Sequence, residues 1–135
     1  MLIDYFKEEQ KHDQSIEKME IYTSGLRRTK QTATPLREKL GFKATEFSQL
    51  NEINAGVCDG LTYDELRRKM PEVFASRKKD KFGYRYPRGE SYLDLICRLE
   101  AMIYELERSR QPLFIVSHQA VMRCLYCYFS SKMDK

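Results

Sequence analysis

The chain has 135 residues, of which 41% are hydrophobic and 33% charged, and its formal net charge is +4. This composition excludes a disordered or fibrous chain and fits one small globular domain with its own core. No apolar run approaches the roughly 18 residues that a membrane-spanning helix needs, and the first residues lack the basic and apolar segments of a secretory signal. We therefore expect a cytoplasmic protein that does not bind membranes.

The first half of the chain is predicted to contain short strands separated by helices. Residues 1–18 are charged and favour a helix, and the segment MEIYTS (19–24) has the character of a short strand. Ser24 ends this strand and is a good N-cap for the helix that follows. The segment TEFSQL (45–50) is predicted to be another short strand, leading into a loop rich in Asn, Gly and Asp.

The helix after Ser24 contains Pro35, which costs on the order of 3 kcal/mol in a helix interior because it removes a backbone hydrogen bond. We expect either a kink there or a second helix that starts with Thr34 as its N-cap and Pro35 in its first turn. Gly41 is expected to end the helix, since glycine readily adopts the left-handed conformation of a helix C-terminus.

The second half of the chain is predicted to be mostly helical. Thr62 and Glu65 have the spacing of a capping box. The helix that they begin is expected to stop at Pro71, with a short helix continuing to Ser76. A long helix is predicted from about residue 91 to 108, because its apolar residues recur with the 3.6-residue period.

The segment LFIVSHQAVMR (113–123) is predicted to join a strand to a helix. Leu113–Val116 are continuously apolar, which is typical of a strand covered on both faces. The alternation of strands and helices indicates an α/β fold with a parallel sheet. His118 then stands at the carboxyl end of a strand, where ligands bind in such sheets. A lone histidine is more often structural, so both interpretations stay open at this point.

Arg28 and Glu52 also favour a phosphate site. Arg28 lies in the first turn of a helix, where a cation is unfavourable unless an anion lies nearby. Glu52 lies in a loop beside an apolar strand, and partial burial would raise its pKa toward that of a general acid; the alternative is an ordinary surface carboxylate. With His118 and Arg123 they form a set that suits phosphoryl transfer, which depends on positioning and charge neutralisation.

The segment RKKDKFGYRYPR (77–88) holds six basic residues and one aspartate. Such a cluster favours a polyanionic partner, and its interleaved aromatic residues also permit nucleic-acid binding. From these residues alone, a solvated loop, a site for a phosphorylated metabolite and an RNA-binding surface all stay open.

The four cysteines are typical of reduced thiols rather than of a disulfide framework. They are Cys58, Cys97, Cys124 and Cys127. The last two form a CxxC pair about two turns inside a predicted helix, whereas reactive pairs usually stand at a helix amino end. We therefore predict neither a redox nor a zinc-binding role for them, and no metal site elsewhere.

Four segments carry a resemblance to a known family: YTSGLRRTKQTA, LNEINAGVCDGLTYDEL, KFGYRYPRGESYLDLICRLE and IVSHQAVMRCLYCYF. They resemble the fructose-2,6-bisphosphatase domain of the bifunctional 6-phosphofructo-2-kinase/fructose-2,6-bisphosphatases, within the histidine phosphatase superfamily. The resemblance covers nearly everything from Glu20 to Phe129. It implies a phosphoglycerate mutase-like fold, a three-layer α/β sandwich with a mainly parallel sheet, of which residues 1–135 form a part that is incomplete at its N-terminus and contains no kinase domain.

The resemblance also implies an activity, the hydrolysis of fructose 2,6-bisphosphate to fructose 6-phosphate and phosphate through a phosphohistidine, which controls glycolysis and gluconeogenesis. Arg28 and His118 match residues that contact the transferred phosphoryl group, and Glu52 matches the acid that protonates the leaving hydroxyl. The sugar bisphosphate would be held further by Tyr63, Arg77, Lys81, Tyr92, Gln119 and Arg123. No cofactor is implied, and the basic segment would bind the second phosphate rather than nucleic acid.

The chain departs from the family pattern most at the nucleophile, a histidine in an Arg-His-Gly motif that no segment here matches. Of the two histidines, His12 lies in a charged stretch without a strand end or glycine turn to present it. We therefore expect this chain to be inactive, and the missing strand to leave an exposed sheet edge. Asn54, where the family usually has Asp, and Pro35 are lesser departures.

Two main interpretations stay open. The chain is either a fragment of an active fructose-2,6-bisphosphatase, with a kinase domain on the same intact polypeptide, or a non-catalytic pseudophosphatase that binds phosphorylated sugars. A basic RNA-binding module is the third alternative.

Overall fold

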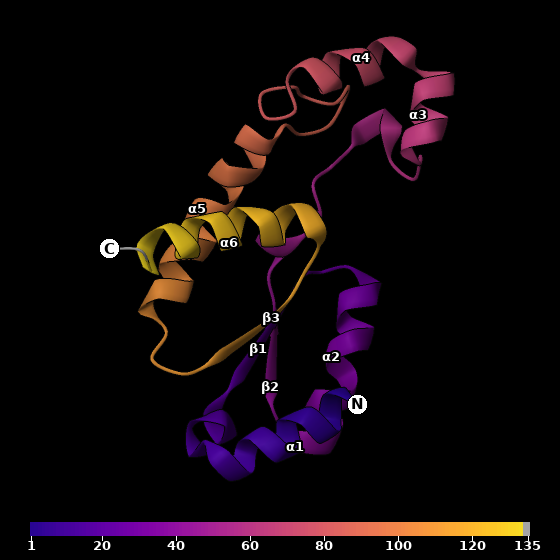
Figure 1. Cartoon of the computed structure of the whole chain (residues 1–135). Helices are drawn as coiled ribbons and strands as arrows, with labels where there is room; N and C mark the ends of the chain where they lie inside the picture. The colour runs from indigo at the N-terminus through magenta and orange to yellow at the C-terminus, as the bar shows by residue number, and fades with distance from the viewer. Residues whose placement is uncertain (134–135) are drawn as a thin grey trace.

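The computed structural model describes residues 1–133, which form a small parallel sheet between two layers of helices (Figure 1). The strands are β1 (Glu20–Thr23), β2 (Lys43–Glu46) and β3 (Leu113–Val116), in the order β2-β1-β3. The helices are α1 (Leu2–His12), α2 (Arg27–Leu40), α3 (Tyr63–Lys69), α4 (Pro71–Lys79), α5 (Tyr92–Arg108) and α6 (Gln119–Met133). Short 3₁₀ helices are η1 (Gln14–Lys18), η2 (Ser48–Leu50) and η3 (Gly56–Cys58).

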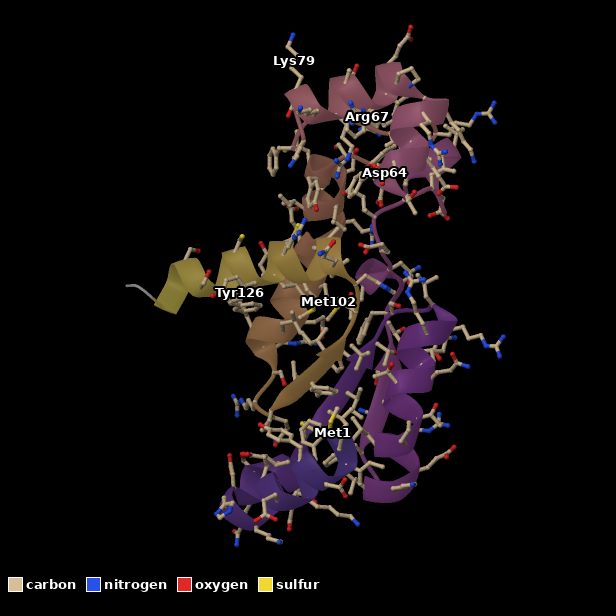
Figure 2. All side chains as sticks on the ribbon, turned by 45° about the vertical axis from the view of Figure 1, so that its right-hand side comes forward. Met1, Asp64, Arg67, Lys79, Met102 and Tyr126 are labelled. Atoms are coloured by element: carbon tan, nitrogen blue, oxygen red, sulfur yellow. The ribbon has the colours of Figure 1, made fainter. Side chains whose placement is uncertain are left out.

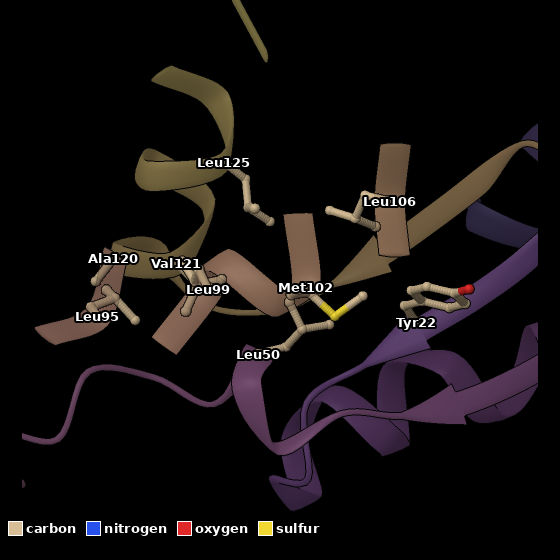
Figure 3. Packing of buried hydrophobic residues seen from close by; sticks show 9 residues of the cluster. All are labelled: Tyr22, Leu50, Leu95, Leu99, Met102, Leu106, Ala120, Val121 and Leu125. Carbon is tan, nitrogen blue, oxygen red and sulfur yellow. The ribbon is translucent and has the colours of Figure 1, made fainter. Parts of the chain in front are cut away.

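Each face of the sheet has its own hydrophobic cluster, because side chains alternate along the central strand β1. Ile21 packs in the cluster beneath α1 and α2, and Tyr22 packs in the cluster beneath α5 and α6. The other buried members of the first are Phe6, Met19, Ala33, Leu36 and Phe42. Those of the second, shown in Figure 3, are Leu50, Leu95, Leu99, Met102, Leu106, Ala120, Val121 and Leu125. The predicted three-layer α/β sandwich with a parallel sheet is confirmed.

The helical pair α3–α4 stands away from the sheet, on the side of the strands' carboxyl ends, while α1 lies at the opposite end (Figure 1). The side chain of Lys79, at the end of α4, points away from the rest of the molecule (Figure 2), and Arg67 on α3 is also exposed. In the described part of the chain, no helix is long and apolar enough to cross a membrane.

The helix boundaries of the second half follow the predicted signals, with one extension. The capping box is confirmed, since the Glu65 N–H donates to Thr62 Oγ1 at 3.2 Å and the Thr62 N–H donates to Glu65 Oε2 at 2.9 Å. The α5 helix begins directly after Ser91, whose side chain caps it. However, α4 continues beyond Ser76 to Lys79. The basic segment therefore begins on a helix, which gives Arg77 a fixed direction.

The structure corrects the predictions for α2. Ser24 is not its N-cap: the helix begins at Arg27 with Leu26 in the cap position. Pro35 lies inside a single continuous helix, so the alternative of a new helix capped by Thr34 is wrong. The Thr34 hydroxyl instead donates to the Lys30 carbonyl at 2.8 Å, as threonine does within a helix. The helix ends at Gly41 as predicted, with a φ of 74°.

Two strand predictions also change. The second strand runs over Lys43–Glu46 rather than 45–50, because the chain turns into η2 and buries Leu50 completely. The last strand occupies the predicted Leu113–Val116 and packs against the clusters on both faces of the sheet, but its burial is less complete than predicted. Within residues 1–133 it is an edge strand paired with β1 alone, and its four side chains are only half-buried.

We predict that Leu99→Ala lowers the free energy of unfolding by about 2–5 kcal/mol, the usual cost of a cavity at a fully buried leucine. Leu99 is 1% exposed and lies in the cluster beneath α5 and α6. Urea denaturation measures the change. Tyr104→Ala, on the same helix but 73% exposed, is the control and should change the free energy by no more than about 0.5 kcal/mol. Equal effects of both substitutions would contradict this packing.

Candidate active site

The candidate site lies where the three parallel strands end. Each strand is followed by a turn, and side chains join these turns to one another. Asn51, in the segment after β2, accepts a hydrogen bond from the Gly25 N–H through Oδ1 at 2.8 Å. The hydroxyl of Ser117, directly after β3, donates to the Leu50 carbonyl at 2.7 Å. These bonds hold the residues after each strand at a single edge of the sheet.

His118 stands at this edge and is 7% exposed. Its Nδ1 accepts a hydrogen bond from the Arg28 Nε–H at 3.1 Å. Because an arginine can only donate, the proton of the neutral imidazole lies on Nε2. That nitrogen is 2.8 Å from Ser24 Oγ, to which it donates. The Ser24 hydroxyl is in turn 2.8 Å from that of Thr29, which donates to the Leu26 carbonyl at 2.7 Å. Arg28 thus fixes the tautomer of the ring, and the buried hydroxyl groups help to fix its orientation.

Burial lowers the pKa of His118 below the ordinary value of histidine, and the positive charge of Arg28 lowers it further. The carboxylate of Glu52 opposes these effects. At neutral pH the ring is therefore uncharged. Since the unfolded chain binds the proton more readily, this group makes the free energy of unfolding fall as the pH decreases through about 6.5 toward the folded-state pKa.

Glu52 faces the amino end of α6. Its Oε1 accepts hydrogen bonds from the backbone N–H groups of Ile53, at 3.0 Å, and Ala120, at 3.2 Å. A helix amino end favours negative charge, so the carboxylate occupies a position that suits an anion. As predicted, Glu52 lies in a partly buried loop beside the other site residues.

The loop that carries Glu52 is held by Arg98, which the sequence analysis missed. Arg98 forms two hydrogen bonds to the Glu90 carboxylate, at 2.8 and 3.0 Å. It also donates to the carbonyls of Gln49, at 2.6 Å, and Asn51, at 3.1 Å. Burial alone would raise the pKa of Glu90, but the hydrogen bond from Arg98 and others lower it, so the pair stays ionised. The available signal for Arg98 in the sequence was its position as a charged residue beside the apolar stripe of the long helix α5.

Two hollows meet at Glu52, which lines both. A hollow of about 570 Å³ is lined on one side by Arg28. A smaller one of about 190 Å³ lies between the start of α6 and the α3–α4 pair. Most of the predicted site residues line this second hollow, namely Glu52, Tyr63, Arg77, Tyr92, Gln119 and Arg123. Arginines therefore line both hollows, together with the carboxylates of Glu52 and Asp59 in both and of Glu90 in the larger one.

Arg77 is the half-buried cation of the smaller hollow. It donates to the Tyr63 hydroxyl at 2.8 Å, and its guanidinium carbon lies 4.8 Å from the Tyr63 ring centroid and 5.8 Å from that of Tyr86. Tyr86 was not predicted as a site residue, although it is one of the aromatic residues of the basic segment. Its burial raises the pKa of its hydroxyl, which stays protonated and able to donate.

Two residues considered in the sequence analysis lie elsewhere. Lys81 is described but exposed, in the turn after α4 and outside the lining of both hollows. His12 is exposed at the end of α1, with Nε2 3.7 Å from a Glu8 carboxylate oxygen, and α1 lies at the opposite end of the sheet (Figure 1). Among residues 1–133, no group of three or more His, Cys, Asp or Glu side chains is placed to hold a metal ion.

The comparison with known proteins identifies the family. The family model of the histidine phosphatase superfamily (branch 1) matches residues 8–134, and the chain belongs to this superfamily. It is 57% identical over 112 residues to a 6-phosphofructo-2-kinase/fructose-2,6-bisphosphatase of Arabidopsis thaliana, a match that covers 83% of this chain and 15% of that protein. The match to 6-phosphofructo-2-kinase/fructose-2,6-bisphosphatase 1 of Homo sapiens has 50% identity over 119 residues and covers 88% and 24%. The chain thus spans a quarter or less of the length of these relatives.

Solved structures of other proteins share the fold of this chain. YhfR of Bacillus stearothermophilus is 30% identical, with a TM-score of 0.68 over 83% of this chain and 56% of that one. A mycobacterial glucosyl-3-phosphoglycerate phosphatase is 25% identical, with a TM-score of 0.69 over 81% and 57%. The predicted phosphoglycerate mutase-like fold is therefore confirmed, and the chain is a phosphatase by family.

We predict that the pKa of His118 lies below about 6.5 in the free protein and rises when inorganic phosphate is added, because an anion stabilises the imidazolium. An NMR titration of the imidazole C–H signals measures both values. The His12→Gln variant leaves His118 as the one histidine to follow. A pKa at or above the ordinary value without phosphate, or one that phosphate leaves unchanged, would contradict the described environment.

Proposed function

We propose that this chain carries the substrate-binding part of a fructose-2,6-bisphosphate 2-phosphatase. The supporting observation is the position of Glu52 where two hollows meet, with Arg28 lining one of them and Arg77 and Arg123 lining the other. A sugar with two phosphate groups matches two arginine positions, one in each hollow. A sugar monophosphate would leave one of the cationic positions without an anion, and such charge-assisted hydrogen bonds are the stronger class.

In this proposal the phosphate to be transferred lies beside Arg28 and His118. Their mutual hydrogen bond would be replaced by bonds to phosphate oxygens, which is the step that raises the pKa of His118. In its protonated form, Glu52 would donate a proton to the sugar oxygen as the bond to phosphorus breaks. The second phosphate would bind Arg77 and Arg123, and the sugar would contact Tyr63, Tyr92 and Gln119. The assignment of Lys81 to the second phosphate stays a prediction. The reaction as proposed uses no cofactor.

Turnover through a phosphohistidine needs a second histidine near the same phosphate. His12 lies at the far end of the sheet, so residues 1–133 supply no such acceptor. We propose that the acceptor comes from a segment of the intact polypeptide that also carries a kinase domain, as the names and lengths of the relatives suggest. The alternative, a non-catalytic protein that binds phosphorylated sugars, rests on the same hollows and on the missing histidine, and it predicts the same binding.

We predict that the chain binds fructose 2,6-bisphosphate more tightly than fructose 6-phosphate. Arg77→Ala should weaken the binding of the bisphosphate about tenfold or more, since a hydrogen bond to a charged group contributes about 1.5–3 kcal/mol. The same substitution should change binding of the monophosphate less. Isothermal titration calorimetry at low and moderate salt measures these affinities.

Lys79→Ala is the matched control, because it removes an exposed cation from the same helix and leaves the lining of the hollows intact. It should alter the affinity by no more than about twofold. A short RNA serves as the competing ligand, and its binding would weaken steeply with salt and depend little on which cation is removed. Tighter binding of RNA, with no preference for the bisphosphate over the monophosphate, would refute the proposal.

A further inference from the structure

Cys124 and Cys127 line an apolar groove of about 460 Å³ between α5 and α6. Cys124 is half-buried and Cys127 is exposed, and all four cysteines of the chain carry free thiols. The remaining wall is mainly aromatic and aliphatic, and includes Tyr92, Ile96, Ile103 and Tyr128. A pair of thiols therefore stands at the side of a hydrophobic space large enough for an aromatic ring.

The two cysteines are three residues apart on α6, so they lie on neighbouring turns of one helix face. Side chains at this spacing have Cβ atoms about 5–6 Å apart. Rotation about the Cα–Cβ bonds can turn both sulfur atoms toward a single atom between them. Burial raises the pKa of the Cys124 thiol and the neighbouring Cys127 raises it further, which agrees with this proximity.

The environment of the pair favours one kind of ligand. Burial, followed by the neighbouring Cys127, raises the pKa of Cys124, so this thiol stays protonated at neutral pH. A divalent cation requires thiolates and, for a stable protein site, further donors. Among residues 1–133, no third His, Cys, Asp or Glu joins the pair in a metal-binding group. The pair therefore suits a ligand that accepts two thiol protons and needs only two sulfur atoms.

We propose that Cys124 and Cys127 form a dithiol site for a trivalent arsenical that carries an apolar substituent, with the substituent in the groove between α5 and α6. An arsenic(III) oxide of the form R–As=O reacts with two thiols. Two As–S bonds form, the As=O bond and both S–H bonds break, and the oxygen leaves with both protons as water. Arsenic stays trivalent, so the step needs neither an oxidant nor a reductant.

Phenylarsine oxide tests the proposal on the reduced full chain. We expect one arsenical per chain by intact mass, and the loss of two reactive thiols of the four. Cys124→Ser and Cys127→Ser should each weaken binding about 100-fold or more, because the second As–S bond forms within the same molecule. Cys97→Ser, which removes an exposed thiol from α5, is the matched control and should leave the affinity unchanged.

Because Cys127 is exposed, its replacement by serine should leave the core intact, so a loss of binding would not result from unfolding. Thermal unfolding and circular dichroism verify the fold of each variant. Binding by Cys127→Ser as tight as that of the parent, or its loss in Cys97→Ser, would overturn the proposal. Arsenite, which has no aryl group, tests the groove. It should bind about tenfold more weakly or worse, because burial of apolar surface contributes roughly 25 cal/mol per Å², and equal affinity would exclude a role for the groove.

Discussion

Parallel pairing of β1 with both of its neighbours brings three strand ends, and the residues after each, to one edge of the sheet. In this register Thr23 lies opposite Glu46 on one side and Val116 on the other. Ser24 follows β1 directly and His118 lies two residues after the end of β3, so their side chains meet although 94 positions separate them. A slip of one residue would turn the side chains of a strand to the opposite face of the sheet. The site therefore depends on the two buried clusters that hold the sheet.

Once the strand ends are together, polar networks fix the side chains. The hydroxyl groups of Ser24 and Thr29 orient the His118 ring, and Arg98 holds the loop of Glu52 through Glu90 and backbone carbonyls. Buried polar groups are costly unless they are hydrogen-bonded, and a satisfied network is rigid for the same reason. The functional groups are thus positioned before a ligand arrives, which reduces the ordering that binding requires.

The sequence predicted those features that depend on neighbours in the chain. The capping box at Thr62, the period of α5 and the helix end at Gly41 are local signals, and each is confirmed. Ser24 was predicted to cap a helix because that is its usual role after a strand, but contacts across the fold use its hydroxyl for His118. Proline disfavours a helix interior, yet Pro35 lies within α2. Here the packing of Ala33 and Leu36 outweighs the local preference.

The polar network of the site was harder to predict, because its partners are distant in the sequence. Arg98 contacts carbonyls 47 to 49 positions earlier, and no local period indicates such a contact. Most of the residues that the resemblance to a family suggested line the smaller hollow, whereas Tyr86 and Arg98 became visible only in the structure.

A crystal structure of the chain with fructose 2,6-bisphosphate tests the central claim most directly. The account predicts one phosphate within hydrogen-bond distance of Arg28 and His118 and the other at Arg77, with Glu52 between them. Both phosphates in one hollow, or binding confined to the exposed cations of residues 78–81, would contradict it.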